Sequence, residues 1–253
     1  MRDILTELRP RSFADFAGNE EIVETLRRLI SKDRVPSAIL FSGAPGSGKT
    51  TLATIVGRAL SCENWKLGIG DPCGRCKSCI WNSVGAYPWN GYHLPPGYKP
   101  CEKAFAEGLD SVANGVALWS ESNRAIMTVD DIDGLAKPLQ IILRGRLDNP
   151  WPAGNLLATS AEPGKLDPPL RQRMIEYQLQ TPELSQISSW CRRMLTKRLG
   201  LKVKDKGSVD ALVEFGNMNF RSVLKIVHAL ATDGGDVTMK SVKMAAMECG
   251  YGF

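Results

Sequence analysis

The chain has 253 residues, a formal net charge of +5 at pH 7 and 43% hydrophobic residues, enough for one large folded domain or for a medium and a small one. No apolar run approaches the ~18 residues of a membrane span. The first five residues also lack the apolar core of a signal peptide. We therefore expect a soluble, cytoplasmic protein without membrane contact, whose mild positive charge permits DNA binding without requiring it.

The first predicted helix covers residues 20–30. Its apolar residues, at positions 22, 23, 26, 29 and 30, form one helical stripe. Pro10 rules out a continuous helix in the segment before it.

Residues 43–50 lie between a short apolar strand at residues 38–41 and a helix at residues 51–60. They fit the phosphate-binding pattern G-x-x-x-x-G-K-[ST], known as the P-loop. Glycines let backbone N–H groups approach phosphate oxygens, and the helix N-terminus adds partial positive charge. We expect Lys49 to reach the β- and γ-phosphates of ATP and Thr50 to bind Mg²⁺. The predicted nucleotide-binding residues of the loop are Gly43, Pro45, Gly46, Ser47, Gly48, Lys49, Thr50 and Thr51.

Four of the seven cysteines cluster after this helix. The first is followed, after ten residues, by two overlapping C-x-x-C steps. Soft thiolates suit Zn²⁺, and four protein ligands leave no open position, so we predict a structural site rather than a catalytic one. Unligated or redox-active thiols are the alternative. The predicted zinc ligands are Cys62, Cys73, Cys76 and Cys79, whereas Cys101, Cys191 and Cys249 are predicted to be ordinary thiols.

Residues 80–100 combine aromatic side chains with proline and glycine. Such aromatic residues stack on nucleic-acid bases or grip a partner in some proteins. The alternative is that they pack an irregular loop onto the body of the protein. A helix is predicted at residues 105–116, after this stretch.

The next predicted strand begins at Arg124 and ends in Asp130 and Asp131. We expect Asp130 to hold the Mg²⁺ shell and Asp131 to orient or deprotonate the attacking water. A helix at residues 136–147 and a strand at residues 155–160 follow. The chain then becomes wholly helical, with predicted helices at residues 183–199, 208–215, 220–232 and 237–248.

The segment LRPRSFADFAGNEEIVETLRRLI, the P-loop and the cysteine cluster together resemble the clamp-loader branch of the AAA+ ATPases. The pairing of P-loop and zinc module resembles most specifically the gamma/tau motor subunits of bacterial polymerase III. The resemblance covers roughly residues 6–79 and 124–232. It implies that the segment containing Arg9 and Pro10 lines the adenine pocket. Between these two ranges we find no match to the strand and acidic stretch that the family carries.

The resemblance also implies roles for residues in the second half of the chain. Ser160 is expected to sense the γ-phosphate or the attacking water, with Thr159 as the fallback. Arg173, or alternatively Arg171, is expected to be the arginine finger that enters a neighbour's site, because a guanidinium makes planar contacts to phosphate oxygens. A salt bridge within the chain is the alternative for both. Arg221 is expected to touch the γ-phosphate, with a surface position as its alternative.

We therefore predict an α/β parallel sheet flanked by helices, in an AAA+ ATPase domain of residues 1–181 that carries the zinc module at residues 62–79. A helical lid domain of residues 182–253 follows. The expected cofactors are ATP, Mg²⁺ and structural Zn²⁺. The expected function is ATP hydrolysis by a homo- or hetero-oligomer that loads a sliding clamp or similar ring onto DNA. Most AAA+ motors have Glu at the position of Asp131, so we expect slow hydrolysis.

Clamp loaders carry a third helical domain, the collar, and no matching pattern follows the predicted lid. This leaves two alternatives open. One is a nucleotide-controlled switch on DNA, such as a helicase loader or transposition regulator of a phage or mobile element. The other is a catalytically silent clamp-loader subunit, although the intact Lys49 and Asp130 argue against it.

Overall fold

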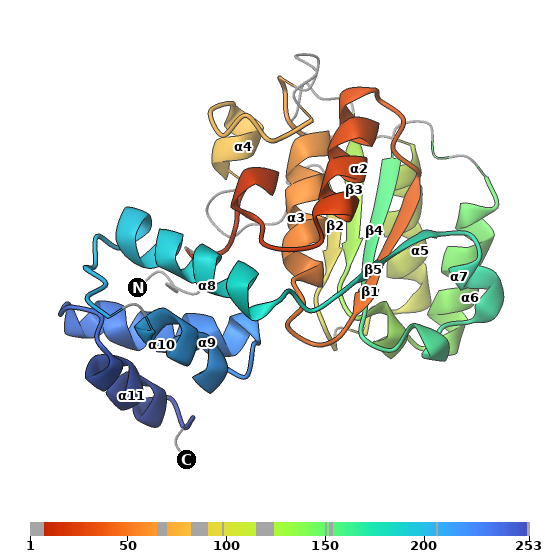
Figure 1. Cartoon of the computed structure of the whole chain (residues 1–253). Coiled ribbons are helices and arrows are strands. Elements are labelled where there is room, and N and C mark those ends of the chain that lie inside the picture. The colour runs from red at the N-terminus through yellow and green to blue at the C-terminus, as the bar shows by residue number, and fades with distance from the viewer. Residues whose placement is uncertain are drawn as a thin grey trace.

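A parallel sheet lies at the centre of the larger half of the molecule (Figure 1). The computed structural model describes residues 8–64, 70–81, 91–97, 99–114, 124–149, 151, 154–205 and 207–251. Within these residues the sheet has five strands in the order β2-β3-β4-β1-β5, and all neighbouring strands are parallel. The strands are β1 (Ala38–Gly43), β2 (Gly91–Leu94), β3 (Ala125–Val129), β4 (Gly154–Ser160) and β5 (Ile175–Leu179).

Helices cover both faces of the sheet, because successive side chains of a strand point to opposite faces. On β1, Ile39 packs with α2 and α3, whereas Leu40 packs in the core beneath α5, α6 and α7. Both side chains are fully buried. The helices are α2 (Glu20–Ser31) and α3 (Lys49–Leu60) on one face, and α5 (Glu102–Ala113), α6 (Lys137–Leu147) and α7 (Pro168–Arg171) on the other.

The last part of the chain forms a separate helical group beside the sheet (Figure 1). It has its own apolar core, in which the rings of Trp190 and Phe220 meet edge to face with centroids 5.0 Å apart. The helices are α8 (Leu184–Arg193), α9 (Ser208–Phe215), α10 (Phe220–Asp233) and α11 (Met239–Glu248). A turn of π-helix, Met194–Arg198, follows directly after helix α8.

The N-terminal segment connects the two cores. Leu8 and Ala17 pack into the core of the helical group, whereas Phe13 packs with α2 and α3 against the sheet. Asn19 then makes two hydrogen bonds to the backbone of Gln180, at 3.0 and 2.8 Å, at the start of the connection to α8. The predicted boundary between residues 181 and 182 falls in this same connection.

The predicted α/β sheet with flanking helices is confirmed, and the predicted elements lie within a few residues of those observed. Two edge strands, β2 and β5, were not predicted. β2 has only four residues, which is short for a recognisable pattern, and four of the five positions of β5 are partly or fully exposed. Two short helices, α4 (Lys77–Trp81) and the 3₁₀ turn η4 (Ile132–Gly134), complete the regions discussed below.

Within the described residues, no helix combines the length and the apolar character that a bilayer-spanning segment needs.

Candidate nucleotide site and metal centre

The P-loop connects the end of β1 to the first turn of α3. Gly48 has φ 99° and forms the N-cap of α3, whose first residue is Lys49. Gly46 has φ 82°, and a Cβ atom there would lie 2.2 Å from Nδ2 of Asn219. Only glycine suits both positions, since L side chains rarely adopt this backbone conformation and a Cβ at Gly46 has no room.

Lys49 lies inside the loop and is 7% exposed. Its Nζ donates hydrogen bonds to the carbonyl oxygens of Gly43 and Ala44, both at 2.9 Å. Burial lowers the pKa of Lys49, whereas the carboxylates of Asp131 and Asp130 act in the opposite direction. The ammonium group is thus held beside the backbone that a phosphate group would approach.

Two acidic residues follow β3 and are linked to β4 by one hydroxyl group. Thr159 Oγ1 donates to Asp130 Oδ1 at 3.0 Å and accepts a hydrogen bond from the backbone N–H of Asp131, also at 3.0 Å. The backbone N–H of Asp130 donates to the carbonyl of Leu94 in β2, so three strands meet here. Burial and the charge of Asp130 raise the pKa of Asp131. These carboxylates fit a Mg²⁺ site, because oxygen ligands suit this hard cation.

Thr159 and Ser160 both lie at the end of β4, but only Thr159 faces the side of the sheet on which α3 packs. Side chains alternate along the strand, so Thr159 faces α3 and Ser160 faces the opposite side. The Oγ atom of Ser160 is buried and has no hydrogen-bond partner among the described residues. The sensing role stays a prediction, and these positions favour the fallback, Thr159, over the first choice, Ser160.

The helical group reaches the P-loop through the start of α10. Asn219 Oδ1 caps this helix by accepting hydrogen bonds from the backbone N–H groups of Arg221 and Ser222. Its Nδ2 donates to the carbonyl oxygen of Pro45, 174 positions away in sequence, at 3.1 Å. The charge of Arg221 acts on the pKa of both Lys49 and Asp131, so Arg221 lies near the predicted phosphate position.

The predicted adenine-pocket segment also lies near the loop. A Cβ atom at Gly48 would meet the ring of Phe16 at 2.9 Å. Arg9 itself is exposed, and its carbonyl oxygen accepts a 3.5 Å hydrogen bond from Arg198 of the helical group. Contact of Arg9 and Pro10 with adenine remains a prediction.

Both candidate arginine fingers form ion pairs within the chain. Arg173 pairs with Asp148 at 2.5 Å, and Arg171 pairs with Glu176 at 2.7 Å. Burial would raise the pKa of Glu176, but hydrogen bonds from Arg171 and Ser42 hold it below its usual value. These partners lie after α6 and on β5, not on the P-loop, so neither arginine is paired with its own predicted nucleotide site.

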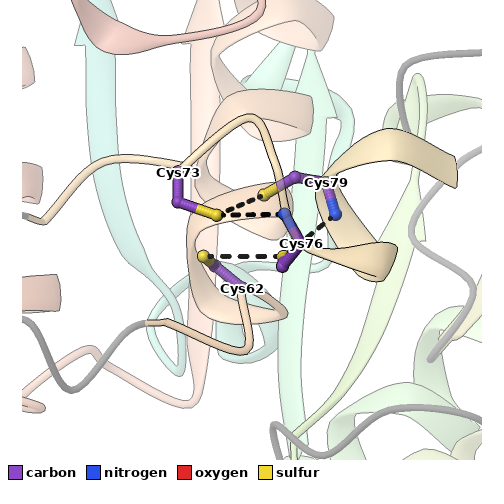
Figure 2. A group of neighbouring side chains, drawn as sticks. All are labelled: Cys62, Cys73, Cys76 and Cys79. Carbon is purple, nitrogen blue, oxygen red and sulfur yellow. Dashed lines mark hydrogen bonds between the residues drawn. The ribbon is translucent and has the colours of Figure 1, made fainter.

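The four clustered cysteines bring their sulfur atoms together, as Figure 2 shows. All four Sγ atoms lie within 4.8 Å of one another, with Cys62 and Cys76 at 4.0 Å and Cys73 and Cys79 at 3.9 Å. A tetrahedral site with zinc–sulfur bonds of ~2.3 Å has sulfur–sulfur edges of about 3.8 Å. The arrangement therefore fits a tetrathiolate metal centre.

Hydrogen bonds within the cluster favour thiolate sulfur. The backbone N–H groups of Cys76 and Cys79 donate to the sulfurs of Cys73 and Cys76, each at 3.3 Å, and Asn64 Nδ2 donates to Cys73. The hydrogen bond with Cys79 lowers the pKa of Cys62 to about 5. The same hydrogen bond raises the pKa of Cys79, and burial raises the pKa of Cys76. Metal binding requires all four cysteines to be deprotonated, so it would be coupled to the release of these protons.

Much of the aromatic stretch at residues 80–100 lies outside the described residues, including 82–90 and 98. The described part shows His93, whose Nδ1 forms a 2.8 Å hydrogen bond with the hydroxyl of Thr128 on β3. Burial lowers the pKa of His93, and the charge of Asp130 opposes this effect. His93 thus belongs to the polar layer beside the candidate Mg²⁺ residues, a role that its sequence context did not suggest.

The parallel sheet, the P-loop and the helical group beside them resemble the fold of the AAA+ ATPases. The structure is similar to the Thermotoga maritima RuvB Holliday junction branch migration motor, with a TM-score of 0.64 and 18% sequence identity. The match covers 96% of this chain and 72% of that chain. At this level of identity the likeness establishes the fold alone.

Comparison with sequence relatives points to one branch of proteins with this fold. A family model described as "DNA polymerase III, delta subunit" matches residues 18–89. DNA polymerase III subunit tau of Escherichia coli is 24% identical over 236 residues, which are 92% of this chain and 35% of that protein. Subunit gamma/tau of Mycoplasma pneumoniae is 38% identical over 80 residues, 31% of this chain and 11% of the relative. These matches support a clamp-loader-like AAA+ protein. The chain spans about a third or less of the length of these two relatives.

Proposed function

We propose that the chain binds and hydrolyses ATP with Mg²⁺ as a subunit of an AAA+ oligomer that acts in DNA replication. The observation that carries this proposal is the convergence of Lys49, the Asp130–Thr159–Asp131 arrangement and the start of α10 around one phosphate-binding loop. The similarity to gamma and tau subunits supports replication as the setting. In this proposal residues 1–181 form the ATPase domain and residues 182–253 form its lid.

The residues of this chain have distinct tasks in the proposed reaction. Lys49 and the N–H groups of the loop bind the phosphates, and Asp130 with Thr50 holds the metal ion. Mg²⁺ neutralises charge on the phosphate oxygens when it is bound. Asp131 orients the attacking water through its carboxylate, and its raised pKa suits proton transfer. Thr159 fixes the positions of both acids.

The finger arginine comes from a neighbouring subunit in this proposal. Arg173 is the first choice and Arg171 the second. Their ion pairs are partly exposed, with side-chain exposures of 33% and 42%, so each is held by ~1 kcal/mol or less. Contact with a neighbour's triphosphate would replace these pairs.

We expect such an oligomer to load a sliding clamp or a similar ring protein onto DNA.

One observation favours the second candidate function, a slowly hydrolysing switch on DNA. Asp131 carries the water-orienting carboxylate on a side chain one methylene shorter than the Glu of most AAA+ motors. A turnover that stays slow in the assembled oligomer with DNA would favour the switch.

Complementation between two inactive variants tests the shared site. Lys49→Ala removes nucleotide binding but keeps both arginines, whereas the double variant Arg171→Ala, Arg173→Ala keeps the P-loop. Each variant alone is expected to lack turnover, and a mixture is expected to regain part of it, because one variant supplies the finger to the other. Normal turnover by the double variant alone, or a mixture that regains no turnover, would refute the shared site.

A further inference from the structure

A buried arginine lies beside the cysteine cluster. Arg58 lies on α3 and is only 4% exposed. One guanidinium nitrogen, Nη2, donates to the carbonyl oxygen of the ligand residue Cys79 at 3.3 Å. The Nε atom is buried and has no hydrogen-bond partner among the described residues.

A permanently charged group in this position needs a compensating charge. Burial of an unpaired ion is costly, so buried charges are normally paired or lie next to a metal centre. Within the described residues, no carboxylate lies within ion-pair distance of Arg58. Asp71, one of the nearby acids, instead accepts a hydrogen bond from the backbone of Phe13.

The cysteine cluster supplies this charge when it holds a divalent metal. Four thiolates carry four negative charges and the ion carries two positive ones, so the centre has a net charge of about −2. Cys62, Cys76 and Cys79 are themselves buried, which keeps solvent from screening that charge. A cation in contact with the backbone of a ligand is therefore well placed to offset it.

We propose that Arg58 is the charge partner of a tetracysteine metal centre and attaches that centre to α3. The proposal rests on the metal site and deepens it by assigning a residue outside the four ligands. It also has a structural consequence. Arg58 is nine residues from Lys49 on the same helix, about 13 Å along its axis, so the metal centre and the P-loop share one rigid element.

Two arginine-to-methionine substitutions distinguish the proposed role of Arg58 from a general effect of removing positive charge near the cluster. Arg58→Met keeps the length of the side chain and removes the buried charge. Arg75→Met removes the same charge between two ligands in sequence, but Arg75 is exposed and solvated. Metal affinity is measured by competition with a chromogenic chelator on the full chain, and Co²⁺ absorption verifies tetrahedral sulfur coordination. We expect Arg58→Met to weaken metal binding by roughly 10- to 100-fold, whereas Arg75→Met changes it by less than about two-fold.

Thermal melting of metal-loaded and chelator-treated protein distinguishes a charge partner from a packing residue. If Arg58 is a charge partner, Arg58→Met lowers the melting temperature of the metal-loaded protein only. In the metal-free protein the charge of Arg58 has no partner, so its removal does not lower the melting temperature. Arg58→Lys retains the charge and is expected to recover part of the affinity, which keeps the test valid if the methionine variant folds poorly. Equal loss of stability with and without metal, or wild-type affinity in Arg58→Met, would overturn the proposal. Failure of the wild-type chain to bind Zn²⁺ or Co²⁺ would instead refute the metal site itself.

Discussion

At the scale of single residues, Thr159 connects the two acidic residues of the candidate site. Its hydroxyl is 3.0 Å both from a carboxylate oxygen of Asp130 and from the backbone nitrogen of Asp131. One hydroxyl group therefore fixes the proposed Mg²⁺ ligand, Asp130, and the proposed water-orienting residue, Asp131, relative to each other. The neighbouring Ser160 has a hydroxyl of similar chemistry on the opposite face of the sheet.

This pair provides a matched test. Thr159→Val removes the hydroxyl while keeping the β-branched shape, and loss of two hydrogen bonds of about 1 kcal/mol each is expected to reduce ATP turnover at least about ten-fold. Ser160→Ala removes a hydroxyl that has no partner among the described residues, so its turnover is expected to stay near that of the wild type. Steady-state ATP hydrolysis measures both. The reverse order of effects would restore Ser160 as the sensing residue.

Asn219 connects the helical group to the P-loop with one amide. Its oxygen caps α10 and its nitrogen donates to Pro45, so the two tasks belong to different atoms. Asn219→Asp keeps the cap, because aspartate is an equally good N-cap, but it loses the donor to Pro45. We expect a three- to ten-fold loss of nucleotide affinity, roughly the value of one hydrogen bond, with little change in helix content.

Asn217→Asp is the matched control for this prediction, since it makes the same change at an exposed position two residues away. Nucleotide titration followed by fluorescence measures the affinity, and circular dichroism measures the helix content. Equal effects of both substitutions would show that added negative charge, rather than the contact with Pro45, weakens binding.

The residues that were predictable from sequence share one property, which is that they are close together in the chain. The P-loop and the cysteine spacing are local patterns whose chemistry follows from a few adjacent positions. The contact between Asn219 and Pro45 joins positions 174 residues apart, and no local pattern encodes it. The choice between Thr159 and Ser160 depends on the register of β4, because a shift of one residue moves each side chain to the opposite face of the sheet.

At the scale of secondary-structure elements, buried strands and amphipathic helices were predictable and edge strands were not. β1, β3 and β4 are almost wholly buried and appear in the sequence as apolar runs. β2 and β5 lie at the two edges of the sheet, where only one neighbour and partial burial constrain the residue types. Tertiary contacts, and not local sequence preference, specify these two strands.

The segment that carries the last three clustered cysteines is the element that we expect to depend most on a bound metal. Residues 70–81 contain only the short helix α4, and the cluster has its own small core of cysteine side chains. Removing the metal with a chelator is therefore expected to increase hydrogen exchange in residues 62–64 and 70–81 while the sheet keeps its protection. Hydrogen–deuterium exchange with mass spectrometry measures this change.

Cysteine substitutions give the corresponding control. Cys76→Ser is expected to abolish binding of about one zinc ion per chain, because a structural site needs all four ligands. Cys101→Ser changes an exposed thiol outside the cluster and is expected to leave the metal content unchanged. Elemental analysis of the purified proteins decides between these outcomes, and undiminished zinc in Cys76→Ser would contradict the assigned ligands.

At the scale of the whole molecule, two apolar cores meet at the proposed nucleotide site. The sheet supplies the P-loop and the two acids, the helical group supplies Asn219 and Arg221, and the N-terminal segment packs on both. Movement of one core relative to the other would therefore change the contacts around the phosphates. In the proposed function, binding and hydrolysis of ATP would therefore alter the angle between the sheet and the helical group.

The central claim is that this loop binds ATP, and equilibrium binding of a fluorescent ATP analogue with Mg²⁺ tests it most directly. Lys49→Ala is compared with the wild type and with Lys32→Ala, which removes an exposed lysine at the end of α2. Loss of charge-assisted contacts to phosphate is expected to weaken binding by at least about ten-fold in Lys49→Ala only. We expect saturable binding to the wild type and to Lys32→Ala, with this loss of affinity in Lys49→Ala. Absence of saturable binding to the wild type, or equal affinity in all three proteins, would contradict it.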